Sequence, residues 1–143
     1  MVHFFNAEEE KSIIQSIQKA ENHTSGEIRV HLAKKCTSDP VQEAANEFLR
    51  LKMHKTKERN GMLIWIAPIQ KKLAIIGDKG INEKVGDHFW EEEKDLLLEH
   101  FKKGTYSEGL CQVIHDLGQK LKTFFPVSEK NDNELTDEIS FEK

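Results

Sequence analysis

Residues 61–77 read GMLIWIAPIQKKLAIIG, and this stretch decides the fold. The run from Met62 to Ala67 is apolar without interruption, which is typical of a central strand covered on both faces. Five residues, PIQKK, then separate it from a second apolar run, Leu73–Gly77. A connection this short joins antiparallel neighbours. The stretch therefore predicts a β-hairpin with one strand in the centre of a sheet.

A third strand is expected upstream of the hairpin. The segment EIRVHLA (27–33) alternates apolar and polar residues, which predicts a strand with one apolar face. Between this strand and the hairpin, Asp39 followed by Pro40 marks a helix start, since aspartate caps the first turn and proline needs no hydrogen-bond partner there. Two strands joined through a helix form a right-handed parallel unit. The sheet is therefore expected to be mixed.

Helical patterns account for most of the remaining chain. Asn6 with Glu9 forms a capping-box signature, and the helix it starts should end near the segment NHTSG. A second helical pattern runs from Ile81 to the glycine at 104 with a break near 86–93, and a last helix precedes Pro126. The fold class is therefore α/β, a small mixed sheet packed between helices as an α/β/α sandwich, in the order α-β-α-β-β-α-α.

Charge is distributed unevenly along the 143 residues, whose net charge is −4. Residues 127–143 hold six acids and two lysines, so residues 1–126 are neutral overall. We expect one domain over 1–126, a disordered acidic tail over 127–143 and no nucleic-acid partner. The alternative for the tail is that Leu135, Ile139 and Phe141, which fall at near-helical spacing, dock onto the domain. The chain shows no signal peptide, no run of apolar residues long enough to span a membrane, and no disulfide framework, so the expected location is the cytoplasm.

Three glycine-bearing turns should meet at one end of this sheet. They are TSGE (24–27), ERNG (58–61) and GDKG (77–80), because parallel strands start at the same end and an antiparallel neighbour finishes there. Oxygen donors on adjacent loops suit Ca²⁺ or Mg²⁺. The candidate ligands are Asp78, Glu27, Asn60, Glu58 and, in the following segment, Asp87.

Two alternatives to this candidate site remain open. Glycine and aspartate are ordinary turn residues, so the three turns need not bind anything. The general rule for open α/β sheets also points to the opposite end, beyond the carboxyl ends of the strands, at Lys34–Asp39.

Three segments resemble blocks of the TPM domain family: KERNGMLIWIA, IIGDKGI and FKKGTYSEGL. Their order and spacing carry the resemblance, which covers about residues 6–124. It implies a small mixed sheet between helices, binding of divalent cations, mainly Ca²⁺, and the phosphatase activity of plant homologues. Carried over to this chain, the resemblance places the same cation site at Glu58 and Asn60, at Asp78 and at Glu27, with Asp87 in a more variable region.

Two classes of function follow from a cation at these turns. In the first, the cation orders the loops of a regulatory or interaction module that has a protein partner. In the second, the cation serves a phosphatase acting on phosphate esters, with Arg59 or Lys79 holding the anion. The chain shows no phosphate-binding loop and no nucleophile motif. We therefore expect a cation-binding module and assign no enzymatic reaction.

Overall fold

Four strands and five helices make up the described part of the chain, which in this computed structural model comprises residues 4–86, 88–127 and 139–142. In chain order the elements are α1 (Ala7–Glu21), β1 (Glu27–Leu32), α2 (Pro40–Arg50), β2 (Gly61–Ala67), β3 (Lys72–Gly77), α3 (Lys79–Asn82), α4 (Glu91–Lys103), α5 (Tyr106–Phe124) and β4 (Ser140–Phe141).

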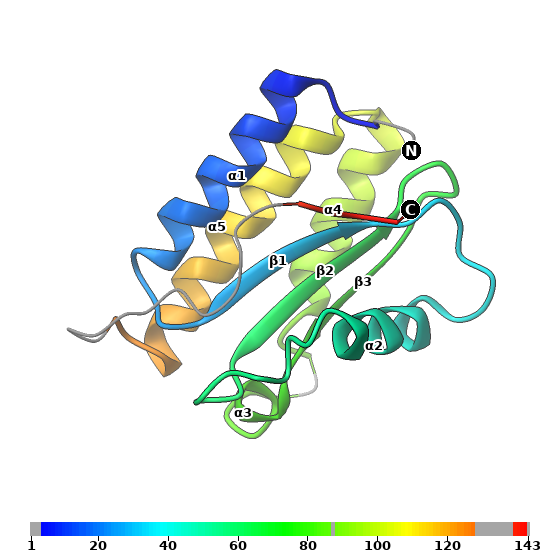
Figure 1. The fold of residues 1–143 in the computed structure, drawn as a ribbon. Coiled ribbons are helices and arrows are strands. Elements are labelled where there is room, and N and C mark those ends of the chain that lie inside the picture. Colours follow the sequence, from blue (N-terminus) through cyan, green and yellow to red (C-terminus); the bar gives the residue numbers. More distant parts are fainter. Residues whose placement is uncertain (1–3, 87, 128–138, 143) are drawn as a thin grey trace.

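The strands form one mixed sheet in the order β3-β2-β1-β4 (Figure 1). β1 and β2 run parallel, with Glu27 opposite Gly61 and Leu32 opposite Ile66. β2 and β3 form the antiparallel hairpin that residues 61–77 predict. The starts of β1 and β2 and the finish of β3 therefore lie at one end of the sheet, which is the arrangement expected from the sequence.

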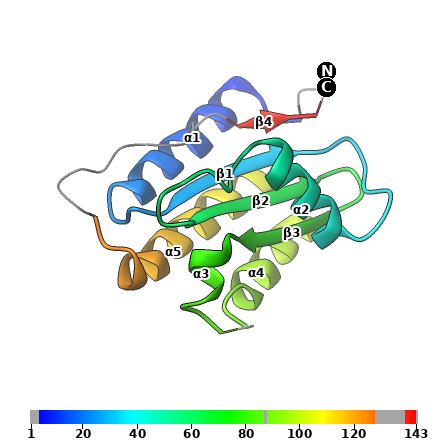
Figure 2. The same cartoon turned by 60° about the horizontal axis from the view of Figure 1, so that its bottom comes forward.

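Helices cover both faces of the sheet. Figures 1 and 2 show α1, α4 and α5 on one face and α2 alone on the other. The larger core joins Ile28 and Val30 of β1 and Ile64 of β2 to the apolar sides of α1, α4 and α5. The smaller core joins Trp65, which is 2% exposed, to Phe48 of α2. This α/β/α sandwich confirms the predicted fold class.

Local signals in the sequence explain where the helices begin. Asn6 and Glu9 form both hydrogen bonds of a capping box at the start of α1. The Asp39 side chain accepts a hydrogen bond from the Gln42 amide at the start of α2, directly before Pro40. The predicted interruption between the third and fourth helices is also present, since α3 ends at Asn82 and α4 begins at Glu91.

The structure differs from the sequence-based expectation on the second face of β1. His31 alternates with apolar residues and was expected to face away from the core, but it is only 1% exposed because α2 and β4 cover it. Its Nδ1 atom lies 3.0 Å from Ser140 Oγ, and its Nε2 atom lies 3.6 Å from a carboxylate oxygen of Glu47. Burial lowers the pKa of His31, although Glu47 offsets part of the effect.

The structure also differs from the expectation of a disordered tail, at residues 139–142. Ser140 and Phe141 pair in parallel with the end of β1, and Ile139 is 7% exposed. The amide of Glu142 donates a hydrogen bond of 3.0 Å to the carbonyl oxygen of Leu32. These residues therefore extend the sheet by one short strand. Residues 128–138 and 143 of the predicted acidic tail lie outside the described part.

Candidate functional site

The first two predicted turns are joined by side-chain hydrogen bonds. A carboxylate oxygen of Glu58 accepts a 2.8 Å hydrogen bond from the hydroxyl of Ser25. The Asn60 side-chain amide donates to both groups, at 3.3 Å to Ser25 Oγ and 3.4 Å to Glu58 Oε2. The Glu27 amide also donates to the Asn60 carbonyl oxygen at 3.2 Å. Polar groups from the starts of β1 and β2 are thus in direct contact.

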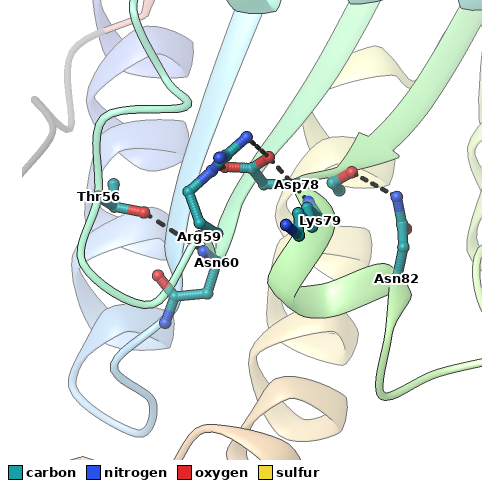
Figure 3. A network of polar contacts seen from close by, with 7 residues as sticks. Thr56, Arg59, Asn60, Asp78, Lys79 and Asn82 are labelled. Carbon is teal, nitrogen blue, oxygen red and sulfur yellow. Dashed lines mark hydrogen bonds and ion pairs between the residues drawn. The ribbon is translucent and has the colours of Figure 1, made fainter.

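The third turn joins the second through an ion pair. Arg59 donates two hydrogen bonds to the Asp78 carboxylate, from Nε to Oδ2 at 2.7 Å and from Nη2 to Oδ1 at 2.9 Å (Figure 3). Asp78 Oδ1 also accepts from the Lys79 amide at 2.8 Å, which caps the short helix α3. The side chain of Asp78 is 5% exposed and that of Arg59 is 43% exposed. This two-point contact raises the pKa of the Arg59 guanidinium.

Backbone contacts hold the same turns together, and they explain the glycines on either side of Asp78. The Gly80 amide donates a 2.8 Å hydrogen bond to the Arg59 carbonyl oxygen. A Cβ atom at position 80 would lie 2.1 Å from the carbonyl oxygen of Glu58, and one at position 77 would lie 2.7 Å from the Trp90 ring. Both positions therefore need a residue without a side chain, for close approach to backbone at one and to an aromatic ring at the other.

Arg59 adopts an unusual backbone conformation in this turn. Its φ angle is 50°, in the left-handed region that residues with a side chain rarely occupy. The turn is nevertheless held in place by the ion pair of Arg59 with Asp78 and by the Gly80–Arg59 hydrogen bond. Uncommon backbone conformations that the surroundings enforce gather at functional sites.

Of the five predicted ligands, the structure brings Glu58 and Asn60 into contact and places Asp78 on the adjacent turn. Glu27 lies at the start of β1 but is 3% exposed, so its side chain is buried. Asp87 lies outside the described residues. Two contributors were missed by sequence reasoning: Ser25, and Arg59 as the partner of Asp78. Ser25 lies inside the predicted turn TSGE, so its hydroxyl was an available signal.

The donor set at these turns is chemically suited to a hard cation. Glu58 and Asp78 offer carboxylate oxygens, Asn60 an amide oxygen and Ser25 a hydroxyl, which are the ligand types of Ca²⁺ and Mg²⁺. No group of three or more His, Cys, Asp or Glu side chains in residues 4–86, 88–127 and 139–142 is arranged to hold a metal ion. Both Asp78 oxygens are engaged by the guanidinium of Arg59 in this structure.

The ion pair also bears on the expected phosphate role of Arg59. Its guanidinium donates two of its N–H groups to Asp78, whose carboxylate also balances its charge. The neighbouring helix α3 has only four residues, and its first backbone amide already donates to Asp78. An anion at Arg59 would therefore compete with Asp78 for the guanidinium.

Comparison with known proteins identifies the family. A sequence model of the TPM domain matches residues 1–120. The chain belongs to the TPM domain family. This TPM domain is similar to the BA42 protein of the psychrophilic bacterium Bizionia argentinensis, whose NMR structure has a TM-score of 0.92 at 42% identity and covers 99% of this chain and 98% of that one. The resemblance inferred from the three sequence blocks is thereby confirmed.

A second solved structure shares only the fold of this TPM domain. It is the N-terminal domain of the cg2496 protein from Corynebacterium glutamicum, with a TM-score of 0.67 at 11% identity, covering 87% of this chain and 79% of that one. The comparison with curated proteins produced no match. Across the described residues, none of the helices combines the length and apolar character that crossing a membrane requires.

Proposed function

We propose that this TPM domain binds a divalent cation, Ca²⁺ or Mg²⁺, where its three turns meet, and that the bound cation orders these turns for a regulatory or interaction role. The observation that carries the proposal is the direct contact of Glu58 with Ser25 and Asn60, beside the carboxylate of Asp78. A cation at this position would join the starts of β1 and β2 to the finish of β3 through shared oxygen ligands.

The proposed ligands differ in how readily they could reach a cation. Glu58 is exposed and can turn toward a cation without unfolding its turn. Rotation of the Asn60 side-chain amide would present its oxygen in place of its nitrogen, since one amide group carries both. Asp78 becomes available when Arg59 withdraws, and the 43% exposure of the Arg59 side chain leaves it room in solvent. Asn60 and Glu27 are the least accessible of the four predicted ligands that the structure describes, at 1% and 3% exposed.

Arg59 is then a competitor of the cation. Its guanidinium satisfies the buried carboxylate of Asp78 while no metal is bound, which avoids the cost of an unpaired buried charge. A divalent cation that uses Asp78 must displace this guanidinium, so the apparent affinity is lower than that of the bare ligand set. The competition predicts that removing the Arg59 guanidinium strengthens cation binding at these turns.

The test is a titration with CaCl₂ and with MgCl₂, followed through the backbone amides by NMR. We expect saturable shifts in 24–27, 58–61 and 77–82, and weaker binding in Glu58→Gln. Arg59→Gln should bind several-fold more tightly, because the competing guanidinium is gone. Asp95→Asn is the matched control, since Asp95 is an exposed carboxylate on α4 away from the turns. Shifts confined to the acidic residues after 127, or unaltered affinity in Arg59→Gln, would contradict the proposal.

The same samples test the phosphatase alternative. We expect no substantial hydrolysis of a phosphate ester with or without the metal, because Arg59 is paired with Asp78 and no nucleophile motif is present in the sequence. A turnover of roughly 1 s⁻¹ or more, in the ordinary enzymatic range, that depends on Mg²⁺ or Ca²⁺ and disappears in Asp78→Asn would establish the enzyme instead.

A further inference from the structure

A cavity of about 180 Å³ lies at the opposite end of the sheet, beyond the carboxyl ends of β1 and β2. Four separate segments line it: the segment before α1, the end of β1, the loop between β2 and β3, and β4. Figure 1 shows β4 alongside the arrowhead end of β1, with the β2–β3 loop nearby. The apolar lining residues are Phe4, Leu32, Ala33, Pro68, Ile69 and Phe141.

The walls of this cavity are held by contacts of their own. Phe4 packs edge-on against the rings of Phe5 and Tyr106, with ring centroids 5.1 and 4.9 Å away. Phe141 is paired with Leu32 in the sheet. The cavity is therefore a formed feature of the fold, since one aromatic wall packs against Phe5 and Tyr106 and the other belongs to the sheet.

Size and lining define the class of molecule that fits. An apolar cavity of about 150 Å³ is large enough to hold a benzene molecule, so this one accepts a single aromatic ring or a short branched hydrocarbon. Ile69 is 74% exposed at the lip although it is apolar, which adds a hydrophobic surface that a bound molecule would cover.

The charges at the cavity select against charged molecules. Among the described residues that line it, Lys34 is cationic and Glu142 is anionic, so their charges cancel. Glu142 also accepts a 3.0 Å hydrogen bond from the Lys34 backbone amide, which places its carboxylate at the rim. A charged molecule would lose hydration on entering the apolar interior with no net field to compensate it. A neutral molecule has no such cost.

We propose that this cavity binds a small, neutral, apolar molecule of about one aromatic ring, and that binding strengthens the docking of β4 on β1. The second part follows from the first because Phe141 and Glu142 belong to β4 and its end. A ligand that contacts them binds the form in which β4 is docked, and linkage requires that it favour that form. The inference is independent of the cation site, which lies at the other end of the sheet.

The experiment uses three probes that share one benzene ring, toluene, benzoate and benzylammonium, titrated into the full chain and followed by NMR. Toluene should give saturable shifts at Leu32, Ile69 and Phe141, with at least tenfold weaker binding of both charged probes. Ala33→Leu adds bulk at a lining residue and should weaken binding, whereas Leu49→Ser, a change to an exposed apolar residue of α2, should leave it unaltered. Ile69→Ser removes the apolar side chain at the lip and should weaken toluene binding. Because Ile69 is 74% exposed, this change does not endanger folding.

Coupling to β4 is tested with a chain that ends at residue 138. It should bind toluene at least tenfold more weakly, and toluene should slow carboxypeptidase digestion of the full chain. Unsaturable shifts, shifts spread over other surfaces, or equal binding of the charged probes would overturn the site. Toluene affinity that survives both Ala33→Leu and Ile69→Ser would also overturn it. Undiminished binding by the shortened chain would overturn the link to β4.

Discussion

Replacing Gly80 by alanine tests how closely the second and third turns are joined. The added Cβ would lie 2.1 Å from the Glu58 carbonyl oxygen and 2.6 Å from that of Arg59. Both contacts are with backbone atoms, which cannot move aside by a simple side-chain rotation. Relief of the overlap requires α3 and the 58–61 turn to separate. That movement lengthens the Gly80–Arg59 hydrogen bond of 2.8 Å and pulls Asp78 away from its guanidinium partner.

The expected loss of stability combines three terms. Overpacking against an immobile neighbour costs about 1–3 kcal/mol. Loss of one backbone hydrogen bond adds about 1 kcal/mol. The greater helix propensity of alanine offsets about 1 kcal/mol at most. The net is a destabilisation of about 2 kcal/mol, which for a domain of this size lowers Tm by roughly 6–8 °C.

Thermal unfolding followed by circular dichroism measures this effect, and Gly86→Ala is the matched control. Apart from its two chain neighbours, no atom of the described residues lies within 4 Å of a Cβ built at Gly86, so that substitution should leave Tm unchanged or raise it slightly. If Gly80→Ala also unfolds within about 2 °C of the parent, the close approach of the two turns is not a constraint, and the reasoning for the joined site fails.

Three further predictions concern other buried contacts. Burial lowers the pKa of His31 below its ordinary 6.5, so the neutral side chain contributes fully to stability above about pH 6.5, and this contribution is lost as the pH falls. The drop in Tm between about pH 7 and about pH 5 should therefore be smaller in His31→Gln than in the parent. Lys120→Met should lower the free energy of unfolding by about 1–3 kcal/mol, because the Glu93 carboxylate, 3% exposed, loses the ammonium group 2.6 Å away. Chemical denaturation measures this loss, and adding Glu93→Gln should recover part of it. A chain ending at residue 138 should lose about 1–2 kcal/mol of unfolding free energy, because it lacks the apolar area that Ile139 buries. An unchanged Tm would show that β4 adds no stability.

Local patterns in the sequence were sufficient for three of the four strands of the sheet and for the starts of the first two helices. The apolar runs on either side of Pro68 predict the hairpin, and the capping signals at Asn6 and Asp39 are formed as expected. These features depend on residues a few positions apart, so periodicity and capping chemistry determine them. The meeting of the three turns also followed from the sequence, because the directions of β1, β2 and β3 leave one arrangement.

The chemistry inside those turns was decided by tertiary structure. Arg59 and Asp78 are separated by 19 positions, and their two-point contact depends on the left-handed conformation of Arg59 and on the close approach of Gly80. Side-chain pairing of this kind depends on positions to within an ångström, which residue spacing does not convey. The same holds for Glu27, whose burial follows from its neighbours in space.

The C-terminal strand shows the same division between local and long-range information. Residues 139–142 lie in an acidic segment without periodicity, and by composition alone such a segment lacks the apolar surface to offset the entropy of ordering. Strand β4 forms because β1 offers a free edge and His31 a buried partner for Ser140. The sequence by itself thus determined the family, the three strands β1, β2 and β3, and the place where the three turns meet. Only the tertiary structure decided which charges pair there and that a fourth strand pairs with the end of β1, because both depend on contacts between residues far apart in the chain.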